Sequence, residues 1–165
     1  MVHTSRVPVL MDVDTGVDDA LAIMMAVKHE GFNLVGITTV NGNVSLEQAT
    51  LNTRKVLHAL NTEYARAIPV VMGADRPLLR PHFFEHHVHG RDGLGGALRD
   101  LELPPMEPRD QHAAAFIVEQ AKLHAGELEL IMTAPLTNLA LAYRLCPELP
   151  RLVKRVVVMG GALLT

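Results

Sequence analysis

The chain has 165 residues, which is enough for one domain with a real core. Apolar residues make up 48% and charged residues 20%, and the formal net charge is −3, an ordinary balance for a soluble globular protein. Because no basic cluster stands out, we expect no nucleic acid partner and no membrane partner bound through bulk charge. The single cysteine, Cys146, excludes a disulfide framework within the chain. Since no apolar stretch has the length of a signal peptide or a membrane span, we expect a cytoplasmic location.

Short β-branched runs alternate along the chain with longer amphipathic segments. The predicted elements are strands at 7–14, 33–40, 68–74, 127–134 and 155–161, and helices at 18–30, 45–60, 110–125 and 136–147. Ser45 is a candidate N-cap of the second helix. The alternation predicts an α/β fold, a Rossmann-like open parallel sheet with helices on both faces, over the single domain 1–165.

One interval, about 75–109, lacks clear periodicity and is rich in Pro, His, Gly and Arg. A segment of this length without regular structure is uncommon in a compact domain unless it works as a lid or a binding loop. We therefore expect a flexible active-site loop there.

Every predicted strand ends in, or is directly followed by, residues that a ligand could use. They are Asp14, then Asn41 and Asn43, then Gly73, then Thr133, then Gly160 and Gly161. In open parallel sheets, ligands bind beyond the carboxyl ends of the strands. The sequence therefore predicts a site at that edge of the sheet.

The first strand ends in the pattern D-x-D-x-G-x-D-D, which places Asp12, Asp14, Asp18 and Asp19 within eight residues. The alternation of a strand puts Asp12 and Asp14 on the same side, and the last two acids open a helix whose dipole favours them. Helix capping does not explain two further acids at the end of a buried strand. Three or four carboxylates can converge here, and such hard oxygen ligands select Ca²⁺ or Mg²⁺ over Zn²⁺.

Other functions remain possible on these residues alone. A D-x-D-type phosphatase of the haloacid dehalogenase kind would use Asp12 as its nucleophile, although Gly16 stands where that motif has Thr. A non-catalytic metal- or ribose-binding remnant is a further alternative. A zinc site is also conceivable, because four histidines follow one another in the loop segment: His82, His86, His87 and His89.

The stretch "DVDTGVDDALA" resembles the signature of the nucleoside hydrolases, the inosine-uridine-preferring N-ribohydrolase family. Further similar segments follow in the same order: "ITTVNGNVSLEQATLNTRKVL", "IPVVMGADRPLL", "HVHGRDGLGG", "IMTAPLTNLALA" and "VVVMGGAL". The resemblance implies a nucleoside hydrolase-like fold, a ribonucleoside substrate, and hydrolysis of the N-glycosidic bond to free base and ribose. It also implies assembly into a homo-oligomer, a dimer or a tetramer.

The resemblance assigns a Ca²⁺ ion to the aspartate cluster. By similarity, the ion is held by Asp14, by Asp19 and by the main-chain carbonyl of Thr133. Asp14 is also the implied base for the attacking water, and Asp12 braces the loop that carries these ligands. The chemistry suits these residues, because a divalent ion acidifies water and carboxylates stabilise an oxocarbenium-like transition state.

The same resemblance implies roles around the nucleoside. Asp18 would hydrogen-bond the ribose hydroxyls, Asn43 would lie beside the ribose and the metal, and His89 would lie near the base or leaving group. Members of this family continue well beyond the point that matches Thr165, and their later residues supply another metal-binding carboxylate and a histidine. We therefore expect an apparently truncated domain with an incomplete metal site, weak Ca²⁺ affinity, little hydrolase activity alone and marginal stability.

Overall fold

The computed structural model describes residues 6–81, 84, 86–105 and 110–161. Within these residues, five parallel strands form one sheet in the order β3-β2-β1-β4-β5. The strands are β1 (Val7–Val13), β2 (Phe32–Thr39), β3 (Val70–Met72), β4 (Glu129–Met132) and β5 (Arg155–Val158). The helices are α1 (Val17–Lys28), α2 (Leu46–Ala59), α3 (Glu63–Ala67), α4 (His86–His89), α5 (Ala113–Leu123), α6 (Thr137–Leu145) and α7 (Leu149–Leu152).

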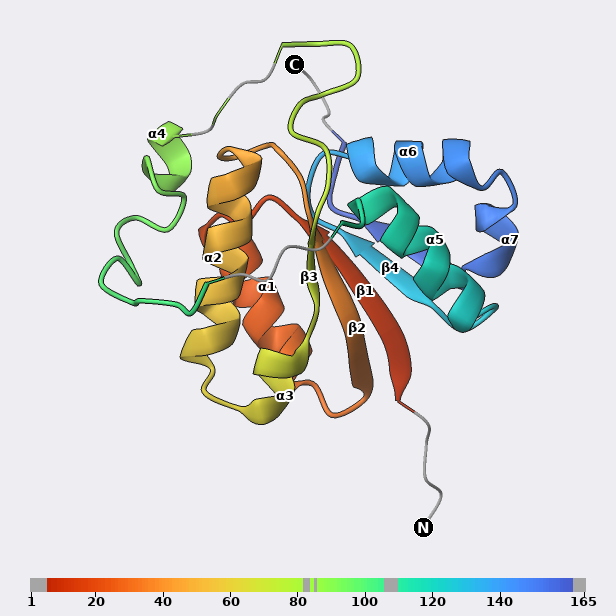
Figure 1. Ribbon diagram of the computed structural model, residues 1–165, viewed down its shortest axis with the longest axis horizontal. Coiled ribbons are helices and arrows are strands. Elements are labelled where there is room, and N and C mark those ends of the chain that lie inside the picture. Colours follow the sequence, from red (N-terminus) through yellow and green to blue (C-terminus); the bar gives the residue numbers. More distant parts are fainter. Residues whose placement is uncertain (1–5, 82–83, 85, 106–109, 162–165) are drawn as a thin grey trace.

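Helices cover both faces of the sheet, as the sequence predicted (Figure 1). The side chains of the central strand β1 pack against helices on both of these faces. Its alternate residues Val9, Met11 and Val13 pack into a core shared with α1, α2 and α3, whereas Leu10 packs into a second core shared with α5, α6 and α7. Since all four side chains are almost completely buried, β1 is an apolar run from Val7 to Met11 rather than an alternation of apolar and polar residues, and Asp12 is the one polar residue within the strand.

The strand order creates a switch point between β1 and β4. The chain builds outward from β1 through β2 to β3, then returns across the sheet to place β4 on the other edge of β1. The register sets Asp12 of β1 opposite Met132 of β4, so the residues that follow both strands emerge side by side. Ligands of open α/β sheets bind at such a reversal of strand order.

Most of the predicted elements are shorter in the structure, whereas β2 keeps the predicted eight residues but begins one residue earlier, at Phe32. Ser45 caps α2 as predicted, because its side chain accepts a hydrogen bond from the Gln48 amide at 3.3 Å. Three short helices, α3, α4 and α7, were not predicted, since four or five residues are too few to show a helical period. Thr62 begins α3 by accepting a hydrogen bond from the Ala65 amide at 3.1 Å.

In the 75–109 segment, α4 and the turns after it run beside α2 (Figure 1), whereas residues 77–81 line a pocket with residues at the start of α6. Two long cationic side chains of α2 hold the part of the segment beside it. Arg54 donates to the Pro104 carbonyl at 2.6 Å, and Lys55 donates to the Leu98 carbonyl at 2.7 Å. The segment is therefore tied to the body of the domain at several points.

The edge strand β5 differs from the rest of the sheet. Val156, Val157 and Val158 remain 38–45% exposed, although the strand is fully paired with β4 on one side. Among the described residues, no helix has both the length and the apolar character needed to cross a membrane.

Gly36 of β2 lets α5 approach the sheet, because a Cβ atom there would lie 2.5 Å from Cε1 of Phe116. We predict that Gly36→Ala lowers the free energy of unfolding by about 1–3 kcal/mol through overpacking. Urea denaturation followed by circular dichroism measures this effect. Asn33→Ala on the same strand is the control, since Asn33 is exposed. Equal stability of the two variants would contradict the proposed contact.

Candidate active site

The aspartate loop, residues 14–16, joins β1 to α1 at the switch point. Three of the four predicted acids are buried, namely Asp12, Asp14 and Asp19, whereas the side chain of Asp18 is 52% exposed. As predicted, Asp18 and Asp19 lie in the first turn of α1. The structure therefore separates one solvent-facing acid from three buried ones.

Asp14 and Asp19 form a pair of buried carboxylates, and each receives hydrogen bonds from a different element. The Asn43 amide donates to Oδ2 of Asp14 at 2.6 Å. The Gly16 amide donates to Oδ2 of Asp19 at 3.0 Å, and the Thr133 hydroxyl donates to its Oδ1 at 2.5 Å. Burial and the charge of Asp19 raise the pKa of Asp14 to about 7, and burial likewise raises the pKa of Asp19.

Glycine is required where the loop after β2 meets this pair. A Cβ atom at Gly42 would lie 2.0 Å from Oδ2 of Asp14, so any side chain there would displace the carboxylate. The absence of a side chain lets the 42–43 backbone close over Asp14 and present the Asn43 amide to it. The "NGN" stretch is therefore more than a turn, because it places a main-chain donor on Asp14.

Asp12 points away from the pair, toward the α6 side of the sheet. Its Oδ1 accepts hydrogen bonds from the Thr38 hydroxyl at 2.5 Å and from the Asn138 amide at 2.8 Å. Burial raises the pKa of Asp12 to about 7. Its Oδ2 is buried without a hydrogen-bond partner among the described residues. Because the side chain is completely buried, it is not accessible as the nucleophile of a D-x-D-type phosphatase.

Asn138, which the sequence predicted only as part of a helix start, connects three strand ends. Its Nδ2 donates to Asp12 and, at 3.0 Å, to the Thr39 carbonyl at the end of β2. Its Oδ1 accepts from the Ala74 amide, just beyond β3, at 2.9 Å. The side chain is fully buried, and a Cβ atom on Gly73 would collide with it. Asn138 is thus a structural part of the site that sequence reasoning missed.

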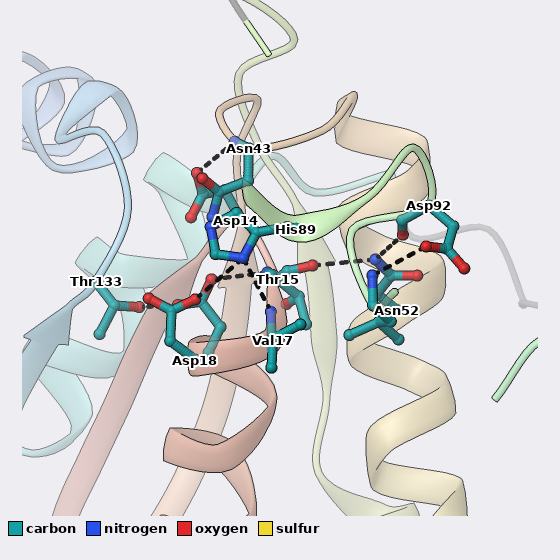
Figure 2. Close-up of polar contacts among 12 residues, drawn as sticks. Asp14, Thr15, Val17, Asp18, Asn43, Asn52, His89, Asp92 and Thr133 are labelled. Atoms are coloured by element: carbon teal, nitrogen blue, oxygen red, sulfur yellow. Dashed lines mark hydrogen bonds and ion pairs between the residues drawn. The ribbon is translucent and has the colours of Figure 1, made fainter. Parts of the chain in front are cut away.

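His89 comes from the 75–109 segment and lies against the start of α1 (Figure 2). Its Nδ1 accepts a hydrogen bond from the Val17 amide at 3.4 Å and lies 3.9 Å from Oδ1 of Asp18. Gly16 makes room for the ring, because a Cβ atom there would lie 2.9 Å from Nδ1 of His89. The structure thus brings His89 beside the aspartate loop.

The donors fit a hard divalent cation, although fewer carboxylates converge than the sequence predicted. Oδ1 of Asp14 is buried and has no hydrogen-bond partner among the described residues, so an acceptor is available beside Asp19. The prediction that three or four carboxylates converge was wrong, since Asp12 turns into the core and Asp18 faces solvent. Across the described ranges, no group of three or more His, Cys, Asp or Glu side chains is placed to hold a metal ion.

The absence of such a group among the described residues also gives no support to a zinc site. His86, His87 and His89 belong to no such metal-binding group in the part of the chain that the structure describes, and His82 lies outside the described residues. The oxygen donors near Asp14 are instead the kind that Ca²⁺ or Mg²⁺ prefers.

An open pocket of about 580 Å³ lies beside the carboxylate pair. Its wall includes Asp14, Asn43 and Thr133, which follow three different strands, together with residues 134–136 and 158–161. Of the strand-end residues predicted from the sequence, Asp14, Asn43, Thr133, Gly160 and Gly161 line this cavity, whereas Asn41 and Gly73 do not. Asp12 and Asn138 lie behind this wall rather than in it.

The raised pKa values predict how stability depends on pH when no metal is bound. From the ordinary value of 3.8 up to about 7, the folded protein holds protons on Asp14 that the unfolded chain has released. Stability is therefore lost as pH rises through this range. We expect the melting temperature in chelator to fall between about pH 5 and about pH 8. Asp14→Asn should melt higher than wild type at the upper pH and show a shallower slope; an unchanged slope would contradict the burial of this charge.

Asn138→Leu should destabilise the protein strongly, because it leaves buried groups on Asp12, Thr39 and Ala74 without partners. We expect a loss of at least about 3 kcal/mol in the free energy of unfolding. Arg144→Leu on the same helix is the control, since Arg144 is exposed. Urea titrations measure the free energy of unfolding of both variants. If Asn138→Leu loses no more stability than Arg144→Leu, the bridging role of Asn138 is refuted.

Residues 9–165 match the family described as inosine-uridine preferring nucleoside hydrolase. The chain is 39% identical to a probable uridine nucleosidase 2 of Arabidopsis thaliana over 95% of this chain and 48% of that one. It is also 39% identical to the uridine nucleosidase of Saccharomyces cerevisiae, over 96% of this chain and 46% of that one. The chain thus spans about half the length of these curated relatives.

Solved structures give the same result. A plant nucleoside hydrolase, the PpNRh1 enzyme, superposes with a TM-score of 0.86 at 32% identity, over 94% of this chain and 48% of that one. A purine-preferring ribonucleoside hydrolase from Gardnerella vaginalis gives a TM-score of 0.83 at 32% identity, over 94% and 49% of the two chains. Together with the aspartate motif and the site at the switch point, these matches show that the chain belongs to the inosine-uridine preferring nucleoside hydrolase family.

Proposed function

We propose that this chain acts in the hydrolysis of the N-glycosidic bond of ribonucleosides to free base and ribose, with Ca²⁺ as the cofactor. The observation that carries the proposal is the buried pair Asp14 and Asp19 beside a pocket whose wall also holds Asn43 and Thr133. Uridine nucleosidases and a purine-preferring ribonucleoside hydrolase among the similar proteins support this reaction class.

The cation would be held by the carboxylates of Asp14 and Asp19 and by the main-chain carbonyl of Thr133. The buried and unpartnered Oδ1 of Asp14 supports this assignment. When bound, a divalent ion supplies positive charge that orients the sugar hydroxyls and acidifies water. Asn43 and Gly16 fix the other oxygens of the pair through their amides, so the carboxylates are held in place before any ligand arrives.

In the proposed reaction, the oxygen of a water molecule forms a bond to C1′ of the ribose. The C1′–N bond breaks, and its electron pair leaves with the base, which takes up a proton. Asp14 accepts the proton of the water, a role supported by its place in the pocket wall and by its Oδ1, which has no hydrogen-bond partner among the described residues. The carboxylates also stabilise the positive charge that develops on the sugar.

The remaining predicted residues surround the substrate. Asp18 has an exposed carboxylate at the start of α1, suited to bind the ribose hydroxyls. Asn43 lines the pocket beside Asp14 and would contact the sugar. His89 lies next to Asp18 and Val17, and would face the leaving base. The complete burial of Asp12 weighs against the phosphatase alternative.

Calorimetric titration with CaCl₂ tests the proposal on the purified chain. We expect one weakly bound ion per chain, with binding lost in Asp14→Asn and Asp19→Asn because each removes a charged donor. Asp100→Asn, which changes an exposed acid in the loop segment, should bind as wild type does. Absence of Ca²⁺ binding, or equal binding by all variants, would contradict the proposed cation site.

Release of free ribose from uridine and inosine tests the reaction itself. We expect slow turnover at most, dependent on Ca²⁺ and on Asp14, since a further carboxylate and a proton donor are expected from outside these residues. Ribose release that survives Asp14→Asn would refute the role of that residue. Phosphate release from p-nitrophenyl phosphate that is lost in Asp12→Asn would support the phosphatase instead.

A further inference from the structure

Asn52 lies on α2, outside the pocket, and is almost completely buried. Its Nδ2 donates two hydrogen bonds, one to the Thr15 carbonyl at 3.0 Å and one to the Asp92 carbonyl at 2.7 Å. Its Oδ1 accepts from Nε2 of Gln48, one helical turn earlier, at 2.8 Å. Figure 2 shows Asn52 between the aspartate loop and the segment that carries His89.

These bonds connect segments that are far apart in the sequence. Thr15 follows Asp14 directly, and Asp92 lies three residues after His89. A single side-chain amide thus holds both the loop with the buried carboxylates and the loop with the histidine. Because both acceptors are main-chain carbonyls, the bridge fixes backbone positions rather than the ends of flexible side chains.

The turn after His89 is a compact unit that transmits this hold to the histidine. The Gly95 amide donates to the His89 carbonyl at 2.9 Å, and the Gly93 amide donates to the Gly90 carbonyl at 3.1 Å. The carboxylate of Asp92 accepts from the Leu94 amide at 3.2 Å and from the Gly96 amide at 3.0 Å. Fixing the Asp92 carbonyl therefore restricts the whole turn from His89 to Gly96.

Gly93 permits the close approach of this turn to Asn52. Its φ is +79°, in the left-handed region, and a Cβ atom there would lie 2.9 Å from Nδ2 of Asn52. The neighbouring Thr53 also contacts the aspartate loop, through a 2.7 Å hydrogen bond between its hydroxyl and that of Thr15. Its other side-chain hydrogen bond is to the Ala49 carbonyl at 2.8 Å, within α2, so within the described part of the chain Thr53, unlike Asn52, does not bond to the turn, and the two residues can be compared.

We propose that Asn52 is a positioning residue that sets His89 against the aspartate loop. The proposal rests on the proposed function only in the role given to His89; the bridge itself is a property of the folded chain. Asparagine suits the position because one nitrogen supplies two donors, and the oxygen is oriented by Gln48. Aspartate has the same shape, but it would place a carboxylate oxygen against two carbonyl oxygens.

Asn52→Asp and Thr53→Val form the matched pair that tests the bridge. Hydrogen–deuterium exchange measures opening of the turn at the Gly93–Gly96 amides, and the ring resonances of His89 in an NMR spectrum report its surroundings. In Asn52→Asp, we expect exchange of these amides to rise about tenfold or more, because two hydrogen bonds are lost, and the His89 resonances to shift. Thr53→Val should leave both unchanged, and the resonances of the distant His29 should be constant in both variants.

The bridge is overturned if Asn52→Asp folds with wild-type exchange at Gly93–Gly96 and unshifted His89 resonances, or if Thr53→Val changes both equally. If Asn52→Asp does not fold, Gln48→Leu provides the second test, since it removes only the donor that orients Asn52. A smaller increase in exchange confined to the same turn is expected there, and its absence would refute the proposal. Neither amide exchange nor the His89 resonances require substrate. A negative result for the bridge is therefore distinguishable from an absence of ribonucleoside hydrolysis.

Discussion

Two like charges buried side by side are the constraint on which the rest of this structure depends. Asp14 and Asp19 lose their hydration at the switch point of the sheet, and each carboxylate repels the other. Their charge is offset by donors from three directions: the Asn43 amide after β2, the Gly16 amide before α1, and the Thr133 hydroxyl after β4. The loops must therefore meet at this point for the acids to be buried at all.

The helices on the two faces of the sheet hold these loops in corresponding ways. Each face contributes one buried asparagine, Asn52 from α2 and Asn138 from α6. Asn52 joins the aspartate loop to the turn after His89, whereas Asn138 joins Asp12 to the ends of β2 and β3. In both cases, a buried side-chain amide donates to main-chain carbonyls: those of Thr15 and Asp92, in two loops, for Asn52, and that of Thr39, at the end of β2, for Asn138.

Local patterns were sufficient to predict the main elements of this fold. Hydrophobic periodicity located the five strands and the long helices, because burial of one or both faces of an element sets the spacing of apolar residues in its local sequence. The placement of polar residues after the strands likewise located the pocket, and Asp14, Asn43 and Thr133 do meet there. Each of these predictions required only that parallel strands end at one edge.

The orientation of single side chains could not be predicted in this way. Which aspartates converge depends on the side-chain directions at the end of β1 and in the turn at residues 14–16 that follows it, where Asp12 lies in the core and Asp18 is exposed. The roles of Asn52 and Asn138 depend on partners 37 to 126 residues away, and no local period records such contacts. The only sequence signal for Asn52 and Asn138 was a polar residue on an otherwise buried helix face. That signal did not identify the residues to which either side chain is hydrogen-bonded.

The strand order also governs when the site can form during synthesis. Thr133 and Asn138 reach Asp19 and Asp12 across 114 and 126 residues, so β1 keeps one edge unpaired until β4 has been made. At roughly 5–20 residues per second, that interval lasts on the order of ten seconds on the ribosome. During it, the aspartates stay hydrated and the open edge of β1 is exposed to other nascent chains. Assembly of the acidic site and protection from aggregation are therefore completed by the same late docking event.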